Sequence, residues 1–198
     1  MNWYKRKILP RLLSSAMGRS GIEEIRPRVI EKATGVVLEI GAGAGHNLPL
    51  YGHATKIFAL EPSRELQEIA KKRSVKVPVE FIVASAEHIP LANHSVDTVV
   101  STWTLCSVTN PKVVLSEIRR VLRPGGLFVF ADHGRSPNTF VRAVQHIFTP
   151  ITKVFTGNCH LNRNIEALVK EAGFTIQMIE YSRERFKPLM YNYLGVAR

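Results

Sequence analysis

Cysteines and long apolar runs are scarce in this chain of 198 residues. Cys106 and Cys159 are the only cysteines, which is far too few for a disulfide scaffold. No apolar stretch approaches the ~18 residues of a membrane span, and the N-terminus lacks the long apolar core and cleavage site of a signal peptide. These absences favour a cytoplasmic protein. Its length and even composition predict a single domain over residues 1–198.

Acidic residues are a minority among the charged ones. The chain carries 27 Lys and Arg against 16 Asp and Glu, which gives a formal net charge of +11 and a pI of about 10.0. Such an excess favours anionic surroundings, namely nucleic acid, lipid headgroups or acidic substrates, without choosing among them. Because the sequence has no recognised RNA-binding module and no aromatic stacking platform, we expect no specific nucleic-acid partner.

Short β-branched runs alternate with helical patterns along most of the chain. The runs predict strands at 35–41, 56–62, 79–85, 96–103, 127–133, around 174–182 and around 189–197. Helices are predicted at 63–73 with Ser63 as N-cap, at 111–122 from Pro111, and at 164–174 with Asn164 as N-cap and an irregular region before it. The segment RPGG at 123–126 is predicted to stop the second helix. This alternation is typical of an α/β fold, a parallel sheet with helices on both faces.

The stretch VLEIGAGAGHN at 37–47 places three glycines in five positions directly after a predicted strand. A glycine-rich turn between a strand and a helix lets a ligand approach backbone N–H groups at the carboxyl end of a sheet. The dinucleotide pattern G-x-G-x-x-G needs glycine at position 46, where this chain has His46, so a nicotinamide or flavin cofactor fits poorly. Tight packing between strand and helix is the alternative explanation of the glycines.

Glu61 ends the second predicted strand, twenty positions after Gly41. A carboxylate at this place can accept hydrogen bonds from both hydroxyls of a ribose. A surface acid is the alternative explanation. The position at the carboxyl end of a strand, just before Pro62 and the N-cap Ser63, favours ribose binding.

Five segments in combination resemble the class I S-adenosylmethionine-dependent methyltransferases. They are LEIGAGAG, the acidic end of the second strand, ASAEHIPL, VDTVVSTWTLCSV and EIRRVLRPGGLFVFADHG, in this order between about residue 35 and residue 133. The resemblance implies a Rossmann-like, doubly wound sheet of seven strands, mostly parallel with an antiparallel last strand. It also implies that residues 35–133 form the cofactor-binding core and that S-adenosylmethionine lies across the carboxyl ends of strands one to four.

The same resemblance assigns contacts to each part of the cofactor. The glycine loop would pass beneath the methionine part, with Glu39 near its amino group, while Glu61 would hold the ribose and Pro62 would touch the adenine. Trp103 would lie near the methionine part, or would pack in the core. The implied cofactor-binding residues are Glu39, Gly41, Ala42, Gly43, Gly45, Glu61, Pro62, Ala86, Glu87, Ser101 and Thr102.

Adenine recognition departs from the pattern of the family. Many relatives carry Asp at the position of Ser85, where it accepts a hydrogen bond from the adenine amino group. Here the backbone of Ala86 and the side chain of Glu87 are the remaining candidates. Ser101 and Thr102, at the end of the fourth strand, would border the methionine part.

Further segments resemble a narrower group. TWTLCSV, RVLRPGG, GNCHLNR and MYNYLGVA are similar to small bacterial methyltransferases related to animal thiol S-methyltransferases, and Cys106 and Cys159 fall on two matching positions. This resemblance implies methyl transfer to a small-molecule acceptor, with a thiol favoured, although substrates can diverge where folds do not. Two alternatives stay open. One is a phospholipid N-methyltransferase acting on ethanolamine headgroups, and the other is a non-catalytic S-adenosylmethionine-binding protein.

Methyl transfer requires few catalytic groups from the protein. Transfer from a sulfonium is an in-line displacement, so the site mainly aligns the acceptor and excludes water. A thiol must also lose its proton, and the candidate bases are Asp132, His133 and His160. Each of these has a structural alternative, as a turn cap or a buried histidine. Two cysteines and scattered histidines make no metal-ligand spacing, so we expect no metal.

Two segments remain for substrate access. Residues 1–34 contain WYKRKILPRLLSSAMG, with apolar residues on one helical face and basic residues near one end. This pattern predicts a helical cover over the cofactor cleft, and it leaves open a peripheral membrane contact. The segment 137–162, apolar and basic together, is predicted to be an acceptor lid inserted between the fifth strand and the last helix.

Overall fold

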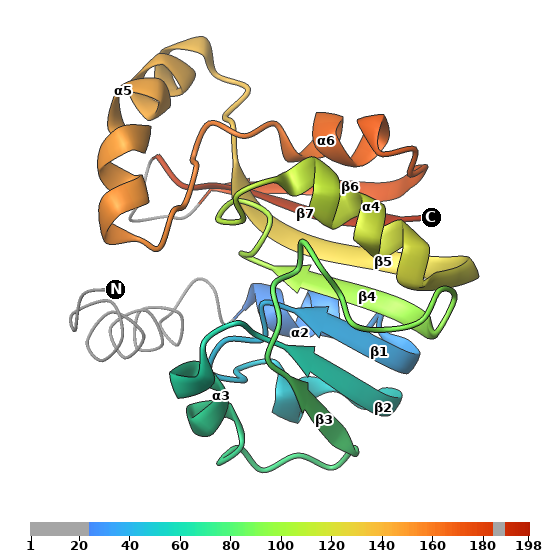
Figure 1. The fold of residues 1–198 in the computed structure, drawn as a ribbon. Coiled ribbons are helices and arrows are strands. Elements are labelled where there is room, and N and C mark those ends of the chain that lie inside the picture. The colour runs from blue at the N-terminus through green and yellow to red at the C-terminus, as the bar shows by residue number, and fades with distance from the viewer. Residues whose placement is uncertain (1–23, 184–188) are drawn as a thin grey trace.

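The computed structural model describes residues 24–183 and 189–198. Within these ranges the chain forms a seven-stranded sheet in the order β3-β2-β1-β4-β5-β7-β6, covered by helices (Figure 1). Strand β7 runs antiparallel to β5 and β6, whereas the pairs among β1 to β5 are parallel. This topology confirms the Rossmann-like, doubly wound sheet predicted from the sequence. The predicted N-terminal helix lies outside the described residues.

The bounds of the elements are as follows. The strands are β1 (Thr34–Ile40), β2 (His53–Leu60), β3 (Val79–Ile82), β4 (Val96–Thr102), β5 (Leu122–Gly134), β6 (Ile176–Arg183) and β7 (Tyr191–Ala197). The helices are α2 (Ile25–Ile30), the 3-10 helix η2 (Leu48–Leu50), α3 (Arg64–Ala70), α4 (Pro111–Val121), α5 (Thr139–Phe155) and α6 (Ile165–Glu171).

A separate hydrophobic core lies on each face of the sheet. On one face, Leu115 of α4 and Ile165 of α6 pack with Phe128 of β5. On the other face, Val29 of α2 packs with Val129, the next residue of β5. Because successive strand residues point to opposite faces, a strand that is covered on both sides buries apolar residues at consecutive positions, as β5 does at Phe128 and Val129.

The helix starts follow the capping residues in the sequence. Ser63 accepts a hydrogen bond from a backbone N–H of the first turn of α3, and Asn164 does the same for α6. Pro111 is the first residue of α4, with Asn110 as its N-cap. All three predicted starts are confirmed, because a side-chain acceptor satisfies a backbone donor that has no partner within the helix.

Strand β5 begins at Leu122, five residues earlier than predicted. Leu122 already pairs with Val96, and the register then shifts so that Leu127 pairs with Thr98. The RPGG segment is therefore an irregularity within the strand and not a turn before it. The sequence signal for a break was correct, but pairing with β4 resumes on both sides of it.

The segment between β5 and α6 differs most from expectation. Instead of an irregular region it contains α5, a helix of 17 residues that starts at the N-cap Asn138 and includes Pro150. Several apolar side chains of α5 are exposed, namely Phe140, Ile147, Phe148, Ile151 and Val154. Across the described ranges, no helix is long and apolar enough to cross a membrane.

Gln145 fixes the middle of α5 to the end of the sheet. Its fully buried amide accepts a hydrogen bond from the backbone N–H of Ser136 at 2.9 Å. It also donates to the carbonyl oxygens of Gly134 and Leu189 at 3.1 and 2.9 Å. One buried side chain thus satisfies three backbone groups that the sheet leaves unpaired.

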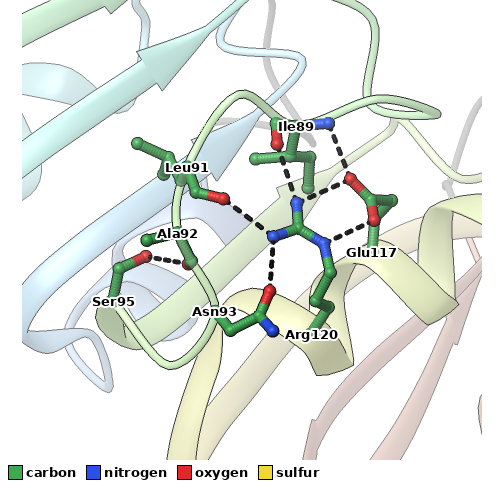
Figure 2. A network of polar contacts seen from close by, with 7 residues as sticks. All are labelled: Ile89, Leu91, Ala92, Asn93, Ser95, Glu117 and Arg120. Atoms are coloured by element: carbon green, nitrogen blue, oxygen red, sulfur yellow. Dashed lines mark hydrogen bonds and ion pairs between the residues drawn. The ribbon is translucent and has the colours of Figure 1, made fainter.

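Arg120 connects α4 to the loop between β3 and β4 (Figure 2). Its guanidinium donates to the carbonyl oxygens of Ile89 and Leu91, both at 2.8 Å, and to the side chain of Asn93 at 3.0 Å. It also forms a two-pronged ion pair with Glu117, which accepts the backbone N–H of Ile89. The network fixes the course of a loop whose first residues reach the carboxyl edge of the sheet.

We expect Arg120→Lys to destabilise the protein by about 1–3 kcal/mol, because lysine keeps the charge but cannot serve several acceptors with a planar fork. Urea unfolding would measure the change. Lys112→Ala is the matched control on the same helix, since its ion pair with Glu171 is exposed and should contribute under about 1 kcal/mol. Equal stability of the two variants would show that the network does not hold the loop.

Candidate active site

A cavity of about 430 Å³ opens at the carboxyl ends of β1, β2 and β4. Its walls come from the glycine loop 41–44, the end of β2, the loop residues 85–87, the segment that follows β4, and two residues after α5. Strand β1 pairs with β2 on one side and β4 on the other, so the strand order reverses here. Doubly wound folds bind ligands at such a reversal, and the volume is typical of small-molecule sites.

The glycines of the loop have different reasons for being glycine. A Cβ on Gly43 would meet no other atom closer than 3.8 Å, so packing does not require glycine there. Its φ of 55° is one that glycine adopts readily, and the open space beside it is part of the cavity. A Cβ on Gly45 would lie 2.9 Å from the Cβ of Ala70 in α3. Tight packing therefore applies to Gly45, and to Gly41, where a Cβ would collide with Oγ1 of Thr104, while the open space beside Gly43 leaves room for a ligand.

Glu61 presents a preorganised carboxylate to the cavity. It is 7% exposed, and its two oxygens accept the backbone N–H groups of Gly43 at 3.0 Å and Ser63 at 2.9 Å. Burial raises the pKa of Glu61, while the two backbone hydrogen bonds lower it. Each oxygen keeps a second lone pair, so the group can accept hydrogen bonds from a diol without rearranging.

Glu39 lies at the end of β1 and is 1% exposed. Its oxygens accept hydrogen bonds from Asn47 at 2.7 Å and from the hydroxyl of Tyr51 at 3.0 Å. Burial raises the pKa of Glu39 to about 7, against the lowering effects of these bonds and of the charge on Arg26. A cation that enters the cavity next to Glu39 would therefore favour the ionised form.

Arg26 and Trp103 complete this end of the cavity. Arg26 donates to Asn47 at 2.6 Å, and its guanidinium lies 4.9 Å from the centroid of the Trp103 ring. Trp103 adopts a φ of 51°, which is rare for a bulky residue and is found mainly where function constrains the backbone. Its indole N–H donates to Asn192 at 3.2 Å, so the ring is fixed in place.

Three residues were predicted to contact the adenine. Pro62, Ala86 and Glu87 all line the cavity. The Glu87 carboxylate accepts the backbone N–H groups of Thr109 and Asn110 at 3.0 and 3.3 Å, so its side chain already holds the loop before α4. The backbone of Ala86 is left as the better placed of the two candidates for adenine.

The structure brings most of the predicted cofactor residues to one wall. Those lining the cavity are Glu39, Gly41, Ala42, Gly43, Glu61, Pro62, Ala86, Glu87 and Thr102. Gly45 and Ser101 lie outside the wall. Ser101 is fully buried and donates to Asp132 at 3.3 Å, because neighbouring strand residues face opposite sides and Thr102 takes the side of the cavity.

None of the three candidate bases lines the cavity. Asp132 is fully buried, accepts the backbone N–H of Cys106 at 3.0 Å, and has its pKa raised by burial. His160 directs Nδ1 at the carbonyl oxygens of Asn158 and Cys106, at 2.8 and 3.2 Å. Both side chains therefore fix the backbone around Cys106, and the role of each, like that of His133, as a base stays a prediction.

Cys106, His133 and Cys159 come together behind the cavity. All three are buried, and one ligand atom from each lies within 4.8 Å of the others. The Sγ atom of Cys159 is 3.7 Å from Nδ1 of His133. The expectation that cysteines and histidines are scattered is therefore wrong for these three, which are far apart in the sequence and adjacent in the fold.

The predicted lid contributes little to the described wall. Of residues 137–162, Thr156 and Gly157 line the cavity. The turn that follows is fixed to the segment after β4, because Asn158 donates its amide to the carbonyl oxygen of Ser107 at 2.7 Å. Whether the segment moves as a lid stays a prediction.

Arg26, Asn47 and Tyr51 were missed by sequence analysis. Asn47 and Tyr51 follow the glycine turn closely, so polar residues just after such a turn are the signal that could have identified them. Arg26 lies on a short helix before β1, in the sequence IRPRVI, and nothing in that pattern distinguishes a cavity residue from a surface arginine.

Comparison with known proteins gives consistent matches. Residues 38–130 match the profile of the family described as "Methyltransferase domain". Thiol S-methyltransferase TMT1B of Rattus norvegicus is 34% identical over 158 residues, which cover 76% of this chain and 64% of the rat protein. Human thiol S-methyltransferase TMT1A is 31% identical over 169 residues, covering 79% of this chain and 69% of that protein. The chain thus spans less than two thirds of the rat relative's length.

Solved structures agree on the fold. An S-adenosylmethionine-dependent methyltransferase from Mesorhizobium loti superposes with a TM-score of 0.69, covering 91% of this chain and 99% of that one at 16% identity. An identity this low supports the fold alone. The human relative, 31% identical and covered over 69% of its length, shows that the chain belongs to the S-adenosylmethionine-dependent methyltransferases, and the family profile and the fold agree with this.

Proposed function

We propose that this protein transfers the methyl group of S-adenosylmethionine to a small thiol. The observation that carries the proposal is the extent of the similarity to the thiol S-methyltransferases. The matches cover 158 and 169 residues, well beyond the 38–130 span of the cofactor-binding profile. The similarity therefore extends beyond that span, and we infer that it includes the segments that surround the acceptor, where substrate preference is decided.

The cofactor would bind between two carboxylates. When bound, it supplies an electrophilic methyl group on a sulfonium. Glu61 would hold the ribose hydroxyls, Glu39 would face the cationic amino group, and the bare backbone at Gly43 would allow close approach. Two buried carboxylates in one cavity suit a ligand that carries positive charge, because such a ligand offsets the cost of their desolvation.

The acceptor would enter beside Trp103 and Gly157, which both line the cavity. The thiolate sulfur would form a bond to the methyl carbon as the bond from that carbon to the sulfonium breaks, and the thiol proton would leave beforehand. Asp132, His133 and His160 remain the candidates to receive it, and residues 137–162 remain the candidate lid.

If Glu61 holds the ribose, Glu61→Gln should weaken S-adenosylmethionine binding about 10- to 100-fold, because charge-assisted hydrogen bonds contribute roughly 1.5–3 kcal/mol. Titration calorimetry would measure the affinity, with circular dichroism to verify the fold. Glu68→Gln, an exposed position on α3, is the control and should bind normally. If the folded Glu61→Gln variant bound S-adenosylmethionine with unchanged affinity, Glu61 would not be the residue that holds the ribose.

Glu39 should make folding stability depend on pH. Its pKa is raised from 4.5 to about 7 in the folded protein, so between these values the folded state binds the extra proton. The stabilisation is complete below about pH 4.5 and is lost as the pH rises through about 7, a change of roughly 3 kcal/mol for this group. Compared with Glu39→Gln, the protein should thus lose free energy of unfolding between pH 5.5 and pH 8.

Denaturant unfolding at several pH values would measure this difference. Glu68→Gln should show no such trend, because its carboxylate is exposed and is ionised throughout this range. Parallel profiles for the protein and its Glu39 variant would mean that Glu39 is ionised at neutral pH in the folded state.

The acceptor class is tested by release of S-adenosylhomocysteine with an aryl thiol, an alkyl thiol, a phenol and vesicles containing phosphatidylethanolamine. We expect both thiols to be methylated, and the thiol of lower pKa to reach its maximal rate at lower pH, since the thiolate is the nucleophile. The Glu61→Gln variant controls for turnover that does not depend on the site.

Two other outcomes would replace the thiol assignment. Methylation of the ethanolamine lipid without any thiol would favour the phospholipid N-methyltransferase, for which the exposed apolar residues of α5 offer a membrane contact. Tight cofactor binding with no acceptor consumed would favour a non-catalytic cofactor-binding protein.

A further inference from the structure

Three side chains with soft or borderline ligand atoms share one buried position. Cys106 follows β4, His133 lies in β5, and Cys159 follows α5. They are 1%, 8% and 5% exposed, respectively. Among the described residues, no fourth cysteine, histidine or carboxylate joins the group.

The backbone holds this position together independently of the three side chains. The N–H of His160 donates to the carbonyl oxygen of Cys106 at 2.8 Å, which joins the segment of Cys159 to that of Cys106. Asp132 accepts the N–H of Cys106 at 3.0 Å, which joins it to β5 beside His133. A site whose ligands are positioned before binding loses less conformational entropy when it captures an ion.

We propose that Cys106, His133 and Cys159 bind a single zinc ion. Thiolates and imidazole are the ligands that zinc prefers, and two cysteines with one histidine form a known set of three protein ligands for it. Three protein ligands leave the fourth tetrahedral position to water or another small ligand. This proposal does not rest on the identity of the methyl acceptor.

The distances fit such a centre. With zinc–sulfur bonds of about 2.3 Å and zinc–nitrogen bonds of about 2.0–2.1 Å, ligand atoms in a tetrahedron lie roughly 3.3–3.8 Å apart. Sγ of Cys159 and Nδ1 of His133 are already 3.7 Å apart, and the whole group lies within 4.8 Å. Small side-chain rotations would therefore close the site without moving the backbone.

The charges also balance. Each cysteine gives up one proton on binding, so two thiolates and a neutral imidazole surround an ion of charge +2 and the complex is neutral. A neutral complex can be buried at far lower cost than an isolated charge. Two protons are released to solvent for each zinc bound.

The centre would adjoin the cavity. Sγ of Cys106 lies 3.4 Å from the hydroxyl of Ser107, and the ring of His133 lies 6.3 Å from that of Trp103. Ser107 and Trp103 both line the cavity. The ion would thus sit next to the part of the cavity wall that Ser107 and Trp103 form.

The test uses the full chain, stripped of metal by a chelator and kept reduced. Titration with Zn²⁺ against a chromophoric chelator should give one ion per chain. Co²⁺ in place of zinc should give the sulfur-to-metal charge-transfer absorption and intense visible bands of a tetrahedral thiolate site. Cys106→Ser and Cys159→Ser should each lower zinc affinity more than about 100-fold. Loss of a hydrogen bond to a metal ligand costs roughly 10- to 100-fold, and loss of the ligand itself should cost more.

His146→Asn, an exposed histidine of α5, is the control and should bind one zinc as tightly as the unaltered protein. The Co²⁺ spectrum of the unaltered protein keeps the test valid if a cysteine variant fails to fold. Reduced protein that takes up no zinc, or Co²⁺ without charge-transfer absorption, would overturn the proposal. So would a Cys106–Cys159 disulfide whose reduction restores no metal binding.

Discussion

Burial of the Glu39 carboxylate at the end of β1 is the constraint on which the cofactor end of the cavity depends. A carboxylate removed from water is unfavourable unless hydrogen-bond donors replace the lost solvent. Asn47 and Tyr51 supply those donors, and Arg26 reaches the same network through Asn47. Because Arg26 also lies over Trp103, the position of one buried acid is linked to that of the indole ring.

The part of the cavity wall after β4 and α5 depends on a different constraint, the joining of two distant segments. The residues after β4 and those after α5 are connected by backbone and amide hydrogen bonds, as between His160 and Cys106 and between Asn158 and Ser107. Asp132 adds a connection from β5 to Cys106. These bonds place Gly157 on the cavity wall and bring Cys106 beside Cys159. The same hydrogen bonds therefore position this part of the wall and the two cysteines.

Much of the fold could be predicted because its signals are local. Alternating strands and helices specify a doubly wound sheet, and Ser63 and Asn164 set helix starts through hydrogen bonds to their own first turns. The start of β5 was wrong because strand pairing with β4 continues across the RPGG segment. Helix α5 was missed although Phe140, Val144, Ile147 and Ile151 recur at helical spacing, because Pro150 in its interior is a residue that normally breaks a helix.

By itself, then, the sequence determined the turn, the strand ends and the family. A glycine loop after β1 and an acid at the end of β2 are set by residues close together in the chain, and parallel strands bring their carboxyl ends to one edge of the sheet. Only the tertiary structure decided that Tyr51 reaches Glu39 and Arg26 reaches Asn47, that Ser101 faces away from the cavity, and that Cys106, His133 and Cys159 meet. Such contacts depend on how separate segments pack across the sheet, and the number of residues between two positions does not predict their distance in space.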